Sequence, residues 1–201
     1  MPNAIYRKSL VLLTGVALAG GALGCSSHVR EGRSPSYLIV DSVLAASGTD
    51  QTFGNTLSSD VETKSAVYSD SGQATMTLAL KDIGPAANPA APTTNNFVTL
   101  TRYHVQYRRS DGRNMQGVDV PFAFDGASTA TITDSATTFT FTLVRLQAKL
   151  EAPLINLVGH GGAGVISTIA DVTFYGTDQA GNEVQATGSI SVNFADWADP
   201  Q

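Results

Sequence analysis

Period-two alternation of apolar and polar side chains is the feature that most constrains how this chain can fold. Over residues 184–194 every second side chain is apolar or small, and those between are Gln, Thr, Ser, Ser and Asn. Such a segment is typical of a β-strand with one face in a core and the other in water. The same register runs through residues 166–174, and the turn-forming sequence DQAGN (178–182) lies between the two. The pattern therefore predicts a terminal hairpin.

Shorter alternating or apolar segments predict the rest of an all-β fold. The expected further strands are 37–46, 74–80, 103–108, 118–124, 130–133 and 139–143. Pro121 cannot donate a ladder hydrogen bond, so it places its strand at a sheet edge. The best helical candidate is the stretch 144–151, which Pro153 ends and which could equally continue the preceding strand. Residues 47–72 and 83–96 are predicted long loops. Because strands do not alternate with helices, the sequence predicts a β-sandwich of about seven or eight antiparallel strands.

The predicted terminal hairpin also carries a family resemblance. The sequence VTFYGTDQAGNEV (172–184) resembles the last two strands of immunoglobulin-like domains in bacterial surface proteins, where a T-D-x-A-G-N turn joins them. The resemblance covers residues 170–194. It implies an immunoglobulin-like or fibronectin-III-like topology, and it carries no activity with it.

The first 24 residues predict an export signal rather than part of the fold. Arg7 and Lys8 give a positively charged start, and the uncharged run 10–24 is too short for a permanent membrane span. The sequence ALGC (22–25) resembles the lipobox of bacterial lipoproteins, in which the cysteine thiol is lipidated and becomes the new N-terminus. The commonest lipobox has Leu three places before Cys, where this chain has Ala. An ordinary signal peptide with an incidental cysteine is the alternative.

Cys25 is the only cysteine, so the exported protein can form no internal disulfide. Lipidation would give this thiol a role, and its acyl chains would anchor the protein to a membrane without spanning it. Residues 25–35 are then expected to be a tether, and residues 36–201 a single domain. Ser26, with no Asp beside the lipidated cysteine, resembles the sorting pattern for the outer membrane of cells that have one.

The charge balance is acidic, with one local exception. Without residues 1–24 the chain has 10 Lys and Arg against 17 Asp and Glu, a net charge of −7, which argues against a nucleic-acid partner. The exception is a basic stripe along and after one predicted strand, formed by Arg102, His104, Arg108, Arg109 and Arg113. It is suited to an anionic polysaccharide, a lipid headgroup or an acidic protein. The alternative is a solvated strand whose charges discourage edge-to-edge pairing.

The glycine-rich sequence GHGGAG (159–164) fits the G-x-G-x-x-G spacing of dinucleotide-binding loops. That site needs a helix after the glycines, whereas residues 165–169 are rich in β-branched side chains and predict a strand. The sequence also resembles the His-Gly-Gly oxyanion loop of esterases, but the chain has no G-x-S-x-G nucleophile elbow. Of the three histidines, His28 lies in the tether, and His104 and His160 are interpreted as surface residues. We therefore predict a non-catalytic protein in which GHGGAG is a loop.

Oxygen ligands for Ca²⁺ are a further hypothesis. Asp178, Asn182 and Glu183, with Asp171, have suitable side chains, but their spacing is not that of an EF-hand. Hairpin formation explains the same residues without a metal. No zinc-binding motif occurs in the sequence, so no cofactor is predicted.

Together these observations predict a lipid-anchored protein of the bacterial cell envelope whose domain binds, adheres or scaffolds. The partners would be the membrane and an unidentified protein or polysaccharide. The alternative is a carbohydrate- or small-ligand-binding module with its site between residues 47–72, 83–96 and 159–164. An envelope hydrolase using His104 or His160 ranks last.

Overall fold

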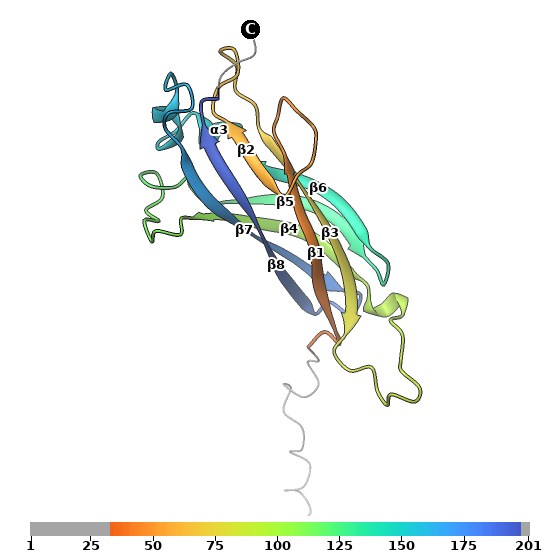
Figure 1. The fold of residues 1–201 in the computed structure, drawn as a ribbon. Coiled ribbons are helices and arrows are strands. Elements are labelled where there is room, and N and C mark those ends of the chain that lie inside the picture. Colours follow the sequence, from red (N-terminus) through yellow and green to blue (C-terminus); the bar gives the residue numbers. More distant parts are fainter. Residues whose placement is uncertain (1–32, 198–201) are drawn as a thin grey trace, which may run out of the picture. The chain divides into compact units, whose positions relative to one another are not determined.

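The computed structural model describes residues 33–197, which form eight strands in two sheets (Figure 1). The three-stranded sheet has the order β1 (Ser36–Ala46), β3 (Asp70–Leu80), β6 (Thr137–Val144). The five-stranded sheet has the order β2 (Thr56–Asp60), β8 (Glu183–Ala195), β7 (Ile166–Asp178), β4 (Val98–Arg108), β5 (Phe124–Ile132). Three short helical segments connect strands, namely η2 (Thr94–Asn96), α3 (Leu146–Lys149) and η3 (Leu154–Leu157).

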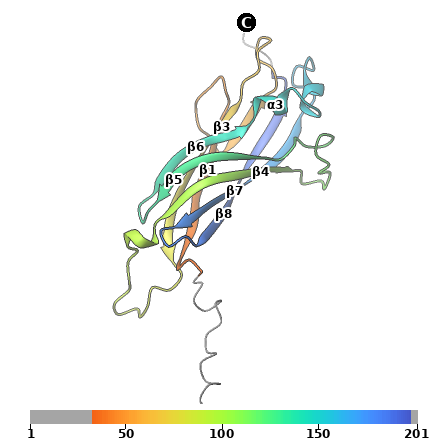
Figure 2. The same ribbon diagram turned by 180° about the vertical axis from the view of Figure 1, so that it is seen from behind.

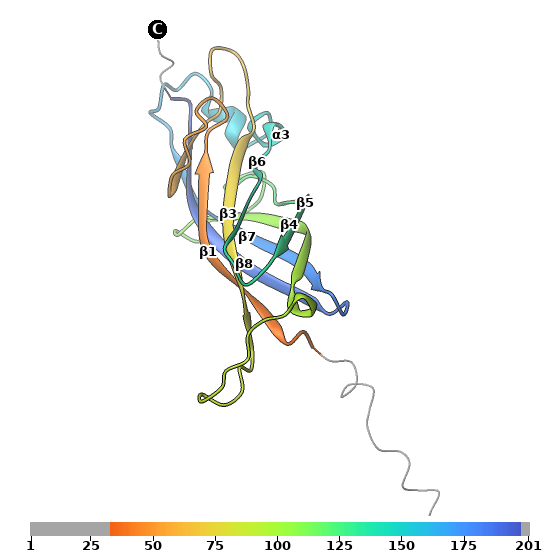
Figure 3. The same cartoon turned by 90° about the vertical axis from the view of Figure 1, so that its right-hand side faces the viewer.

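The two sheets pack face to face, as the side view in Figure 3 shows, and this confirms the predicted all-β sandwich. The inward side chains of both sheets form one core between them. Its centre is aromatic: the Phe174 ring lies 5.3 Å from Phe141, 5.4 Å from Phe139 and 6.4 Å from Tyr103. The two closest pairs are T-shaped, the arrangement in which ring edges meet ring faces favourably.

The strand order is that of an immunoglobulin-like sandwich. β1, β3 and β6 take the places of strands A, B and E, and β8, β7, β4 and β5 take those of G, F, C and C′. Figure 2 shows the five-stranded sheet from the opposite side. The predicted terminal hairpin is present as β7 and β8, which pair from Ile166↔Phe194 to Thr177↔Glu183.

One strand departs from the expected arrangement. β2 lies inside the predicted loop 47–72 and pairs in parallel with β8, whereas all strands were expected to be antiparallel. Its sequence TLSSD has a single apolar residue, Leu57, so alternation could not identify it. Both Leu57 and Ser59 are buried. Because one of the two inward side chains is polar, the strand shows no alternation of apolar and polar residues.

The predicted strand 118–124 is wrong. The backbone amides of residues 118, 119 and 120 all donate to the Met115 carbonyl, and Gly117 has a φ of +76°, so the segment is a tight turn. β5 begins only at Phe124, and its last residues are most of the short strand predicted at 130–133. It is an edge strand of its sheet, but Pro121 precedes it.

Two other elements have limits that differ from the predicted ones. β4 starts at Val98 rather than at residue 103, because a register irregularity between Leu100 and Arg102 interrupts the alternation. Within the predicted helical stretch 144–151, α3 occupies only four residues. None of the helices formed by residues 33–197 has the length and hydrophobicity needed to cross a membrane.

The strand directions place the connections at two ends of the sandwich. Residues 34–35, the loop 81–97 and the turn 179–182 lie at one end, where the Lys81 amide donates to the Pro35 carbonyl (2.8 Å); we call this the N-terminal end (Figure 1). The connections 47–55, 61–69 and 145–165 lie at the other, which we call the distal end.

Candidate functional site

The first half of the basic stripe lies on the outer face of the five-stranded sheet. Arg102, His104 and Arg108 alternate along β4 with buried Tyr103, Val105 and Tyr107. β4 pairs with β7 on one side and with β5 on the other, so it is an interior strand. Protection of a sheet edge, the alternative explanation of these charges, therefore does not apply to them.

Each of these three side chains has an acidic partner on a neighbouring strand. Asp125 of β5 lies 3.2 Å from His104 Nδ1 and 3.8 Å from Arg102 Nη1. Arg108 Nε donates to Asp171 of β7, and this hydrogen bond raises the pKa of the guanidinium. Such exposed pairs add little stability. They neutralise the face, so an anionic ligand would have to displace an internal carboxylate to bind it.

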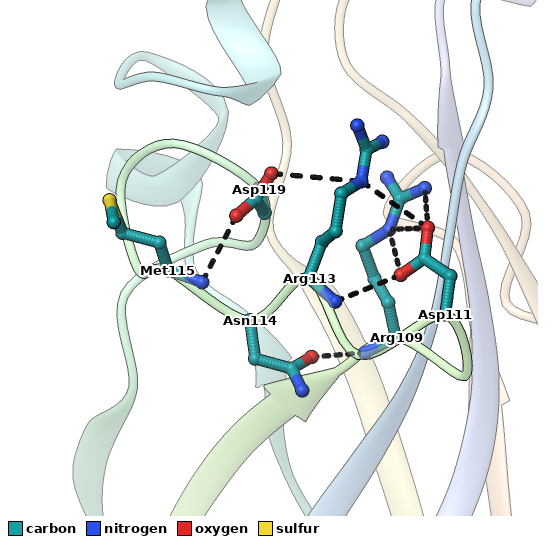
Figure 4. Close-up of polar contacts among 6 residues, drawn as sticks. All are labelled: Arg109, Asp111, Arg113, Asn114, Met115 and Asp119. Carbon is teal, nitrogen blue, oxygen red and sulfur yellow. Dashed lines mark hydrogen bonds and ion pairs between the residues drawn. The ribbon is translucent and has the colours of Figure 1, made fainter.

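The second half of the stripe lies in the loop that follows β4, not on the strand (Figure 4). Arg109 Nη2 lies 2.7 Å from Asp111, and Arg113 Nε lies 3.4 Å from Asp111 and 4.0 Å from Asp119. The Arg109 amide also donates to the Asn114 side chain at 2.6 Å. These contacts make the loop a compact polar unit, with each cation held by a carboxylate of the same loop.

The contacts within this loop predict how the Asp111 carboxyl group titrates. Hydrogen bonds from Arg109 and from the Arg113 amide lower the pKa of Asp111 to about 2. Arg109→Ala is expected to move the Asp111 pKa upward, toward its ordinary value of 3.8. Because the folded pKa is depressed, any stability from this carboxylate is present above pH 3.8 and is lost as pH falls through about 2. Carboxyl ¹³C shifts over an acid titration measure the change, and an unmoved midpoint in the variant would contradict the assigned cause.

A shallow groove of about 400 Å³ lies beside the first half of the stripe. Arg102, Tyr175, Thr177, Glu183 and Gln185 line it. The Arg102 guanidinium stacks 3.7 Å above the Tyr175 ring centroid. Of the stripe residues, only Arg102 lines this groove, and Glu183 contributes the opposite charge.

The calcium candidates organise the β7–β8 turn instead of converging on a common point. The buried Asp178 carboxylate accepts hydrogen bonds from the amides of Ala180 and Asn182, both at 2.9 Å, and from the Asn182 side chain. Burial alone would raise the pKa of Asp178, but these bonds and one from Ser34 outweigh it and lower the pKa. Asp171 is engaged with Arg108 and Ser189. Across residues 33–197, no three His, Cys, Asp or Glu side chains are grouped so as to hold a metal ion.

The GHGGAG loop is a set of turns that leads into β7, as predicted. Gly159, Gly161 and Gly162 have φ values of +80°, +54° and +78°, a region that glycine enters without strain. A strand and not a helix follows, so the loop lacks the helix terminus that a pyrophosphate site needs. His160 is exposed at the tip of this loop, and His104 lies on the outer sheet face.

The predicted three-loop site is not formed. Residues 47–72 and 159–164 connect strands at the distal end, whereas residues 83–96 lie at the N-terminal end. A ligand site that joins all three is therefore ruled out by the strand order. The first of these stretches does contain a groove of its own, described below.

A buried ion pair at the distal end was not predicted from the sequence. Lys149 Nζ lies 2.9 and 3.0 Å from the two carboxylate oxygens of Asp70, and both side chains are almost fully buried, at 2% and 1% exposure. Ser59 Oγ donates to the same carboxylate at 2.6 Å, and the Gly48 amide donates at 2.9 Å. Burial raises the pKa of Asp70, and Lys149, Ser59 and Gly48 oppose that shift. The pair is 79 residues apart in sequence, so no local pattern signals it.

A second groove, of about 430 Å³, opens next to this buried pair, and we call it the distal groove. Its side-chain lining comes mainly from Ser47, Gln51, Phe53, Tyr68, Ser71 and Thr140. It lies on the outer side of the three-stranded sheet, between the connections 47–55 and 61–69. None of its lining side chains carries a charge.

No protein-family model matches the chain, and no curated protein is similar to it. Functional inferences for this protein therefore rest on its sequence and on the arrangement of its residues in the structure.

Proposed function

We propose that the protein is a lipid-anchored lipoprotein of the bacterial cell envelope, exported through residues 1–24 and lipidated at Cys25. Its immunoglobulin-like domain acts without catalysis, in binding, adhesion or envelope scaffolding. Residues 1–32 lie outside the described residues, so the support for the anchor is the sequence itself: a charged start, a short uncharged run, and a lone cysteine that follows a small residue.

The observation that carries the binding role is the placement of the domain's connections. Residues 34–35, which follow the proposed anchor, lie at the N-terminal end of the sandwich, and the distal groove lies at the other. The proposed anchor joins the domain at the first end, and we place the contact with a partner at the second. Surface loops that a rigid scaffold presents are where proteins most often carry their binding residues.

Metabolic labelling tests the anchor. In cells given a radiolabelled fatty acid, the full-length protein is expected to incorporate label and to fractionate with membranes, and Cys25→Ser is expected to lose the label completely. Ser26→Ala is the matched control, because it changes the neighbouring residue and leaves the thiol. Equal labelling of wild type and Cys25→Ser would refute lipidation at this residue.

A further inference from the structure

We propose that the distal groove binds a neutral oligosaccharide, with Tyr68 and Phe53 as the surfaces on which a sugar ring stacks. This inference deepens the proposed binding role and rests on it, but it is independent of the lipid anchor. It is carried by the chemistry, the size and the fixed geometry of the groove.

The chemistry of the lining matches an uncharged polyhydroxylated ligand. Tyr68, 45% exposed, and Phe53 add aromatic rings to the lining, and an aromatic face packs favourably against the C–H groups of a sugar ring. Gln51 and the hydroxyl groups of Ser47, Ser71 and Thr140 both donate and accept hydrogen bonds, as sugar hydroxyls do. The groove beside Arg102 differs, because its charges of both signs favour a zwitterionic or charged group.

The size of the groove also fits. A volume of about 430 Å³ lies within the range of small-molecule sites, which is roughly 300–1,000 Å³, and it accommodates one or two sugar rings. The groove is open to solvent and not a closed cavity, so part of a longer chain can extend out of it. An oligosaccharide therefore fits it better than a fully enclosed small molecule.

One wall of the groove is fixed by hydrogen bonds at its base. The amide and carbonyl of Ala45 pair with those of Gly54, at 2.9 and 2.8 Å, and close the loop that holds Gln51 and Phe53. Inside the loop, Ser47 Oγ accepts from the Asp50 amide, and the Asp50 side chain accepts from the Thr52 amide. Such a preformed wall loses little conformational entropy when a ligand binds.

The buried ion pair joins this wall to the opposite one. Asp70, which follows Tyr68 and Ser69, accepts the Gly48 amide while Lys149 holds its carboxylate in place. The two walls meet so closely that a Cβ on Gly48 would lie 2.5 Å from both the Ser69 carbonyl oxygen and the Tyr68 Cβ. Gly48 and Asp70 therefore hold the loop that contains Phe53 against the segment that contains Tyr68.

The test measures binding of defined oligosaccharides to the full-length protein, purified in a zwitterionic detergent that carries no sugar headgroup. The probes are maltohexaose, cellohexaose and chitohexaose, with heparin as the anionic comparison. At least one neutral hexasaccharide is expected to bind saturably in calorimetry. Tyr68→Ala and Phe53→Ala are each expected to weaken that binding by about tenfold or more, since aromatic anchors dominate such contacts.

Tyr37→Ala is the matched control. Tyr37 is as exposed as Tyr68, at 43%, but it lies at the N-terminal end of β1, opposite Ala79, so its loss is expected to leave the affinity unchanged. Urea unfolding followed by the fluorescence of Trp197, the only tryptophan, checks that each variant is folded. Groove variants that still incorporate the fatty-acid label separate a failure of this inference from a failure of the anchor.

Four outcomes would overturn the proposal. Absence of binding by all three neutral probes rejects a neutral-sugar site, and binding of heparin alone would show a preference for anionic ligands that this uncharged groove does not explain. Equal losses in Tyr68→Ala and Tyr37→Ala would show that the groove is not where the sugar binds. If the folded protein binds none of the four probes but retains a protein partner in a crosslinking experiment on intact cells, the groove is a protein contact instead.

Discussion

Lys149→Met is expected to lower the free energy of unfolding by about 3–5 kcal/mol, the usual cost of removing one partner from a buried ion pair. Methionine keeps most of the volume of the lysine stem, so the loss comes from charge and not from a cavity. The Asp70 carboxylate would remain almost fully buried, with only Ser59 and the Gly48 amide to satisfy it. Urea unfolding monitored at Trp197 measures the change.

The charge explanation has a matched rescue. In the double variant Lys149→Met/Asp70→Asn no charge is buried, and the Asn oxygen can still accept the Gly48 amide. More than half of the lost stability is expected to return, because replacing a whole buried pair by neutral groups costs far less than breaking it. A double variant no more stable than the single one would show that packing, and not the unpaired charge, causes the loss.

The pH dependence of the single variant follows from the same carboxyl group. Burial raises the pKa of Asp70, and removal of Lys149 takes away the largest opposing influence. A group whose folded pKa is raised costs stability as pH rises from its unfolded value through its folded value. The deficit of Lys149→Met relative to wild type is therefore expected to be smaller at pH 4 than at pH 7.

Phe174→Ala is expected to cost about 3–5 kcal/mol as well, for a different reason. The ring is fully buried and contacts Tyr103, Phe139 and Phe141, so its loss opens a cavity that the two packed sheets cannot close. For a domain of this size each kcal/mol lowers the melting temperature by roughly 2–4 °C. Calorimetry of the full-length protein should therefore show a fall of about 6–20 °C.

Phe122→Ala is the control for the aromatic core. Its ring is 45% exposed, in the turn that replaced a predicted strand, and its removal is expected to cost at most about 1 kcal/mol. Equal losses at Phe174 and Phe122 would mean that the assigned core is wrong. The comparison also tests whether residues 118–123 are outside the sheets.

Alternation predicted those strands whose two faces differ. It located β7, β8, most of β3 and the aromatic part of β6, because each of these places apolar side chains inward and polar ones in water. It also predicted a strand at 118–124 that does not exist. Val120 and Phe124 are buried there, but Val118 and Phe122 are exposed on a turn, and a turn can satisfy the same pattern by chance.

The candidate sites depended on strand register, which sequence alone did not supply. The basic stripe was visible as residues, but its acidic partners were not, since Asp125 faces His104 only through the pairing of β5 with β4. Likewise the sequence placed Tyr68 and Phe53 in one predicted loop and gave no sign that they line a common groove. The Ala45–Gly54 bridge and the hydrogen bond from the Gly48 amide to Asp70 bring the two sides of that groove together. Contacts of this kind join residues that no short motif relates.

The sequence by itself determined the class of the fold, the terminal hairpin and the GHGGAG loop, because burial of one face of a strand leaves a local, readable period. It also gives the only support for the proposed anchor at Cys25. The tertiary structure decided the rest: the parallel strand β2, the neutralised sheet face, the separation of loops 47–72 and 83–96 to opposite ends, and the buried pair of Asp70 and Lys149. These depend on which strands become neighbours, and that choice is made by packing of the whole core and not by any one segment.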